Sequence, residues 1–279
     1  MKNILKIMLM MITIYTIAGS AVYAAEIPVS DQDQLITSRD WTEISNLQDE
    51  MKKEEPDATI DYDKALKVYV DCNLIKLQTA DTKKLTSALE SANYVWVIPF
   101  KMEKTYGMFT VAKGLPLSEE AKSVLTKAEQ EEVKNHAGKW MITETAEHTV
   151  EPYYDILLEK REALSDCTRV VLVGSQPGMR QPVALGMDDE TARIWISLGY
   201  QYPVMEKIPE TQNVESGVYS FDSVAEISDT YIEDSEVSTG AGVQSRSSMK
   251  YVAGIGIVLI GGILILSVLK KKKIRIKFF

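Results

Sequence analysis

Apolar residues recur along residues 25–202 with two spacings, one typical of helices and one typical of strands. Side chains three or four positions apart share one face of a helix, and alternate side chains share one face of a strand. The helical spacing occurs over 40–51, 81–92, 118–128 and 152–164. The alternating spacing occurs over 65–70, 93–100, 105–114, 138–143, 168–174, 182–187 and 192–199.

These elements do not alternate regularly as helix and strand, which a doubly wound parallel sheet would require. The charged stretch between 93–100 and 105–114 predicts a hairpin turn. We therefore expect a single α+β extracellular domain, built on a mainly antiparallel sheet with helices on one face.

Two of the expected helices carry start signals. Asp40 and Glu43 have the spacing of a capping box, and Ser118 can cap the helix that follows it. That second helix has the clearest apolar stripe in the chain, formed by Ala121, Val124, Leu125 and Ala128.

A 19-residue stretch without charge, Tyr251–Leu269, contains twelve Ile, Leu or Val residues. A helix of this length reaches roughly 28 Å, close to the ~30 Å hydrocarbon thickness of a bilayer. Six Lys or Arg residues follow within residues 270–279. Basic residues beside a span favour the cytoplasmic side. The pattern predicts one C-terminal transmembrane helix, 251–269, and a basic cytoplasmic tail, 270–279.

The N-terminus has the features of a secretory signal peptide. Lys2 and Lys6 precede an apolar run, and small residues at Val22 and Ala24 fit the signal peptidase positions. We expect residues 1–24 to be removed. Together with the basic tail, this gives a single-pass type I membrane protein whose domain lies outside the cytoplasm.

Charge differs between the exported part and the termini. Removing two basic residues of the signal and six of the tail from 31 leaves 23 against 40 acidic residues, about −17. Phosphate binding needs the opposite sign, so a nucleic-acid partner is not expected. Residues 203–250 are rich in Ser, Thr, Gly and acidic residues and lack apolar periodicity, which predicts a disordered stalk.

Candidate chemistry rests on few residues. The chain has two cysteines, Cys72 and Cys167, and two histidines, His136 and His148, and no metal-binding or phosphate-binding motif joins them. Each cysteine adjoins a predicted strand, so we expect a disulfide between them. Two buried thiols are the first alternative, and a Cys–His nucleophile pair is the second. We expect no metal and no cofactor.

A binding surface is the other candidate. Alternation in residues 192–199 places Ile194, Ile196 and Leu198 on one face and leaves Arg193 and Trp195 on the other. Trp and Arg often anchor interfaces, and Arg180 lies in the preceding Gly- and Pro-containing loop. We expect Trp195, Arg193 and Arg180 to form a contact surface, although a Trp195 covered by a helix is the competing interpretation.

Together these features predict a membrane protein that presents a non-catalytic binding domain to an extracellular protein or envelope ligand. An extracellular hydrolase that uses a Cys–His pair is one alternative. An accessory subunit of a membrane complex, associating through its span, is the other.

Overall fold

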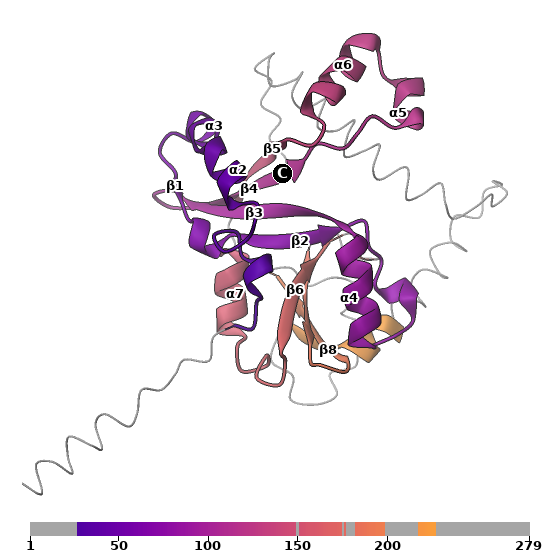
Figure 1. Cartoon of the computed structure of the whole chain (residues 1–279). Coiled ribbons are helices and arrows are strands. Elements are labelled where there is room, and N and C mark those ends of the chain that lie inside the picture. The colour runs from indigo at the N-terminus through magenta and orange to yellow at the C-terminus, as the bar shows by residue number, and fades with distance from the viewer. Residues whose placement is uncertain (1–26, 149–150, 175, 177–181, 199–216, 227–279) are drawn as a thin grey trace, which may run out of the picture.

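The structure is a computed structural model, and it describes residues 27–148, 151–174, 176, 182–198 and 217–226. The fold is α+β, built around a nine-stranded sheet in the order β5-β4-β3-β2-β6-β7-β8-β9, with β1 paired to β3 (Figure 1). The strands are β1 Thr59–Ile60, β2 Leu66–Val70, β3 Asn93–Lys101, β4 Tyr106–Lys113, β5 Trp140–His148, β6 Arg169–Val173, β7 Val183–Met187, β8 Ala192–Ser197 and β9 Val218–Ser220.

Neighbouring strands pair antiparallel except at one join. β2 and β6 pair in parallel, with Val68 opposite Leu172. The strands expected from alternation are all present, including the hairpin of β3 and β4. The mainly antiparallel sheet is therefore confirmed.

The α-helices are short. They are α2 Trp41–Ile44, α3 Gln48–Glu54, α4 Thr82–Ser91, α5 Glu119–Val124, α6 Lys127–His136 and α7 Tyr153–Glu159. Single turns of 3₁₀-helix occur at Asp31–Asp33, Ser45–Leu47, Tyr62–Lys64 and Ile75–Leu77. Residues 221–226 are also helical.

The apolar side chains form three cores, which we name after the helices that cover them. Alternate residues of β6 divide between two of these, with Val170 and Leu172 in the α7 core and Val171 and Val173 in the α4 core. α7 and α4 therefore lie on opposite faces of the sheet (Figure 1). The expectation of helices on one face is wrong, because the central strands are apolar at successive positions and need cover on both sides.

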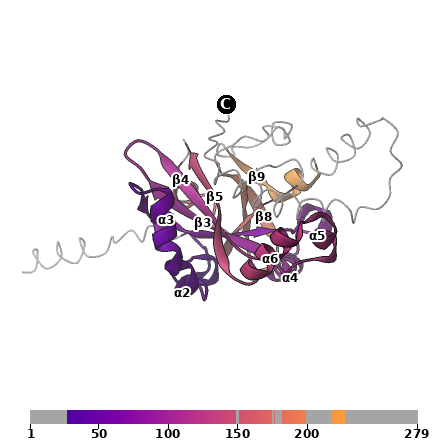
Figure 2. The same ribbon diagram turned by 90° about the horizontal axis from the view of Figure 1, so that it is seen from above.

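The third core lies under α2 and α3, where Ile44 and Met51 pack on Trp96, Ile98 and Phe109. Trp96 is opposite Lys67 in the β2–β3 ladder, so α2 and α3 cover the same face as α4. Figure 2 shows α2 and α3 well separated from α4 along that face. The face is consequently covered at two places with a gap between them.

The helix expected over 118–128 is broken into two. Ser118 caps α5 as predicted, but the chain leaves the helix at Leu125, and Thr126 begins α6 with a capping box to Glu129. Val124 is 66% exposed, so the apolar stripe does not enter a core. α5 and α6, an insertion between β4 and β5 that we call the arm, project from the end of the sheet (Figure 1).

The folded domain continues past residue 202. β9 pairs with β8, and Phe221 and Val224 are buried in the α4 core. The predicted boundary is therefore wrong for residues 217–226, which were assigned to a stalk. Residues 1–24, 251–269 and 270–279, and the rest of the expected stalk, lie outside the described residues. Within the described part of the chain, no helix is long and apolar enough to span a bilayer.

Candidate functional site

Two of the three residues expected to form a contact surface, Arg193 and Trp195, lie on β8 within the described residues. The register of β8 is as predicted, with Ile196 and Leu198 in the α7 core and Trp195 on the opposite face. Trp195 is nevertheless fully buried, because it stacks on Phe221 with ring centroids 5.6 Å apart. The predicted exposure of Trp195 is wrong, since the chain after residue 216 covers it.

Arg193 is exposed near the start of β8 and forms an ion pair with Asp188. Arg180 lies outside the described residues. Of the three residues, the structure therefore describes Arg193 and Trp195, and only Arg193 is exposed. A binding role for Arg193 and Arg180 stays a prediction.

Cys72 and Cys167 are free thiols. β2 and β6 run in parallel, and Cys72 follows the end of β2 while Cys167 precedes the start of β6. The two cysteines therefore lie toward opposite ends of the paired strands, and they pack on different cores. The expected disulfide is absent for this reason.

Burial raises the pKa of each thiol to about 11, and the negative charges of Asp71 and Asp166 add to the shift. Both thiols are then protonated at neutral pH, whereas a cysteine nucleophile needs the thiolate. This argues against the Cys–His hydrolase. Among the described residues, no group of three or more His, Cys, Asp or Glu side chains could hold a metal ion.

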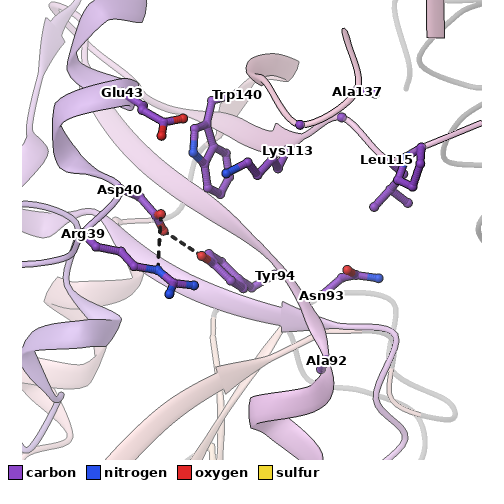
Figure 3. A pocket seen from close by; sticks show the side chains of 13 residues that line it. Arg39, Asp40, Glu43, Ala92, Asn93, Tyr94, Lys113, Leu115, Ala137 and Trp140 are labelled. Atoms are coloured by element: carbon purple, nitrogen blue, oxygen red, sulfur yellow. Dashed lines mark hydrogen bonds and ion pairs between the residues drawn. The ribbon is translucent and has the colours of Figure 1, made fainter. Parts of the chain in front are cut away.

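A cleft of about 670 Å³ opens where the sheet face is left uncovered between α2 and α4. The base of the arm closes its third side (Figure 3). It is lined by Arg39, Asp40, Glu43, Ala92, Asn93, Tyr94, Lys113, Gly114, Leu115, Pro116, Ala137, Gly138 and Trp140. These residues come from four separate parts of the chain, and the fold alone brings them together.

Tyr94 and Trp140 provide two aromatic rings of the cleft, with ring centroids 5.9 Å apart. The Tyr94 hydroxyl donates a hydrogen bond of 2.8 Å to the Asp40 carboxylate, and Trp96 Nε1 donates another of 3.1 Å. The expected capping box at Asp40 is not formed, because this carboxylate turns toward the sheet instead of the helix N-terminus. Asp40 thereby fixes the Tyr94 ring in place.

A buried ion pair lies beneath Tyr94. Lys67 Nζ is 3.4 Å from Asp33 Oδ1 and 4.8 Å from the centroid of the Tyr94 ring. Asp33 also accepts hydrogen bonds from Ser30 at 2.6 Å, Tyr69 at 2.7 Å and Arg169 at 3.0 Å. This network fills the space between the α4 core and the α2–α3 core, so it supports the cleft from below.

The network shifts two pKa values. Burial raises the pKa of Asp33, but hydrogen bonds from Ser30 and Tyr69 and the charges of Arg169 and Lys67 outweigh it and leave the pKa below its usual value. Burial lowers the pKa of Lys67, and the charge of Asp33 opposes this shift. Asp33 is therefore ionised at neutral pH.

Backbone hydrogen bonds of two glycines hold the arm at the edge of the cleft. The Gly114 amide donates to the Lys139 carbonyl at 2.9 Å, and the Gly138 amide donates to the Gly114 carbonyl at 2.7 Å. A Cβ atom at Gly114 would lie 2.1 Å from the His136 carbonyl oxygen. The close approach therefore needs glycine at position 114, and it places Leu115 and Ala137 at the cleft.

The chemistry of the cleft suits binding. Its described lining includes the side chains of Arg39, Asp40, Glu43 and Lys113 beside the rings of Tyr94 and Trp140. It combines charged side chains, aromatic rings and the apolar side chain of Leu115, which is 40% exposed. Sequence reasoning missed it, because Arg39, Tyr94, Lys113 and Trp140 form no spacing motif.

Comparison of the chain with models of protein families, with curated proteins and with solved structures finds no match in any of the three. The site is therefore interpreted from its own geometry.

Proposed function

We propose that this protein is a single-pass type I membrane protein whose extracytoplasmic domain binds an extracellular protein or envelope ligand without catalysis. The cleft between α2, α4 and the arm is the binding site. The cleft itself is the observation that carries this proposal. It joins aromatic, charged and apolar side chains in one concave site, which is the usual composition of ligand-binding sites.

The buried polar network supports the same conclusion. A binding site needs side chains held in place before the ligand arrives, because ordering them on binding costs free energy. Asp40 holds Tyr94 from one side, and the Lys67 ammonium lies over the ring from below. The export signals and the apolar segment at residues 251–269 support presentation of this site outside the cytoplasm.

Site-specific photocrosslinking on intact cells tests the proposal. A benzophenone amino acid at Leu115, in the cleft, should crosslink the ligand. The same group at Leu158, which is on α7 and similarly exposed at 38%, should not. If an outer membrane is present, spheroplasts replace intact cells. Adducts at neither position, or equally at both, would contradict a binding role for the cleft.

A further inference from the structure

Three buried side-chain nitrogens in the described part of the chain have no hydrogen-bond partner: Trp140 Nε1, Trp195 Nε1 and Arg169 Nε. Of the residues that carry them, Trp140 lines the cleft, while Trp195 is enclosed in the α4 core. Trp140 is 7% exposed, so its N–H group has little access to water. A buried donor without an acceptor is unfavourable, and a ligand that supplies the acceptor removes this cost.

Two cations lie in the same cleft. Lys113 extends over the Trp140 ring, with its Nζ atom 5.5 Å from the ring centroid, and forms no ion pair within the described residues. The Arg39 side chain is 86% exposed, and its Nε atom is 3.9 Å from Asp40. Most of its guanidinium donors are therefore available. Figure 3 shows Arg39 and Lys113 on either side of the cleft, with Trp140 beside Lys113.

The acceptors already in the cleft do not satisfy these donors. Asp40 receives hydrogen bonds from Tyr94 and Trp96 and lies beside Arg39. Glu43 is exposed at the edge, beside Trp140 in Figure 3. The described lining holds two cations and two carboxylates, of which Arg39 and Asp40 are paired. The Lys113 ammonium and the Trp140 indole N–H, together with the exposed Arg39 guanidinium, match a further acceptor that carries negative charge.

We propose that the cleft binds a peptide carboxylate, which accepts hydrogen bonds from Trp140 Nε1 and from Lys113 and pairs with Arg39. A carboxylate has acceptors only and can take several donors at once. Leu115, Pro116 and Ala137 line the same cleft and provide apolar contact for another part of the peptide. The proposal deepens the proposed function and depends on the same cleft.

The Trp140 indole N–H provides a direct readout in solution. The chain has four tryptophans, so the ¹⁵N-labelled full-length protein in lipid nanodiscs gives few indole signals, and Trp140→Phe assigns one of them. Sodium N-acetyl-L-leucinate should move the Trp140 signal downfield and saturate in the millimolar range expected for a ligand this small. N-acetyl-L-leucinamide, which lacks the carboxylate, should leave the signal in place.

One further probe, compared with N-acetyl-L-leucinate, separates the sources of the carboxylate. N-acetyl-L-leucinate carries a C-terminal carboxylate, and N-acetyl-L-glutamic acid α-amide carries only a side-chain carboxylate. Stronger binding of the first identifies a peptide C-terminus as the ligand group, and stronger binding of the second identifies an acidic side chain. Either result supports a carboxylate site.

Variants test the individual contacts without removing the Trp140 signal. Lys113→Met should weaken binding about tenfold, as expected for one charge-assisted hydrogen bond. Glu43→Gln should strengthen it, because a competing negative charge is removed. Lys139→Met is the matched control, since Lys139 is exposed beside the arm but does not line the cleft, and it should bind as the unchanged protein does.

Equal shifts with the acid and the amide, or equal weakening by Lys113→Met and Lys139→Met, would overturn the carboxylate site. These outcomes are distinct from failure of the proposed function. A cleft that crosslinks a ligand through position 115 but ignores carboxylates remains a binding site with a different specificity. If N-acetyl-L-leucinate binds in the cleft but no ligand is crosslinked on cells, the carboxylate site is supported and the proposed binding function is contradicted.

Discussion

At the scale of single residues, the ion pair of Lys67 and Asp33 is an unusual feature of the interior. Asp33 is 2% exposed and Lys67 is 8% exposed, and charged residues are seldom this deeply buried without a partner. The structure compensates both charges, with Arg169 and two hydroxyl groups around Asp33 and three aromatic rings around Lys67. The pair is stable because each charge has partners in place.

Removal of Asp33 should therefore be strongly destabilising. Asp33→Ala leaves Lys67 and Arg169 buried without their counter-ion and should lower the free energy of unfolding by about 3–5 kcal/mol. Lys67→Met should cost less, because Asp33 keeps Arg169, Tyr69 and Ser30. Urea denaturation measures both, and the double variant should lose less than the sum of the two. Additive losses would show that the two groups do not interact.

The same carboxylate should make stability depend on pH. The pKa of Asp33 is lower in the folded protein than its usual value, so its ionisation stabilises the fold. This contribution is complete above the unfolded-state pKa of about 3.9 and is lost as pH falls through the folded-state value. Acid titration of stability should therefore show a loss below about pH 4 that is smaller in Asp33→Asn. An unchanged acid limb in that variant would contradict this.

Trp195 should contribute to stability and not to binding. Trp195→Ala removes a fully buried ring stacked on Phe221 and should cost about 3–5 kcal/mol. Arg193→Ala, at the neighbouring exposed position, removes a surface ion pair and should cost less than about 1 kcal/mol. Thermal and urea unfolding of the two variants compare the sites directly. A small loss for Trp195→Ala would restore its role as a surface residue.

At the scale of elements, β9 and the helical residues after it belong to the folded domain, whereas the sequence predicts a stalk there. β9 is three residues long, too short for its alternation to stand out in an acidic segment. β9 pairs with β8 and places Val218 in the α7 core, and the helical residues after it place Phe221 and Val224 in the α4 core. Pairing with a preformed sheet edge allows a weak local pattern to become a strand.

A shortened chain tests this assignment. A protein that ends at residue 202 loses β9 and Phe221, so β8 becomes an open edge and Trp195 loses its stacking partner. It should unfold without cooperativity or aggregate, as exposed edges favour. The matched chain that ends at residue 250 keeps these residues and should unfold in one cooperative transition. Equal stability of the two chains would place 217–226 outside the folded unit.

At the scale of the whole molecule, orientation in the membrane is the prediction with the clearest outcome. Protease added to intact cells, or to spheroplasts if an outer membrane is present, should cut within residues 227–250 and release the domain. The acidic, Ser- and Gly-rich composition there predicts an accessible chain. A cytoplasmic control protein should stay intact. Full protection of the domain would contradict the type I orientation.

Local sequence patterns were sufficient to locate most elements of the folded part. Periodicity depends only on neighbours along the chain, and it predicted α4 and all the strands from β2 to β8. It also predicted which residues of β8 share a face, with Ile196 and Leu198 opposite Trp195. The signal peptide and the span are likewise predicted from local composition, and they lie outside the described residues.

The packing of the elements determined what covers each face of the sheet and which residues come into contact. Periodicity predicts that Trp195 lies opposite Ile196, but Trp195 is buried only because α4 and residues 217–226 pack on its face of the sheet, while α7 covers Ile196 on the other. The prediction that each cysteine lies next to a strand was correct, but the parallel pairing of β2 and β6 keeps the two cysteines apart. The cleft is of the same kind, since Arg39, Tyr94, Lys113 and Trp140 meet through the gap between α2 and α4. Such gaps depend on contacts between distant segments, which local sequence patterns do not predict.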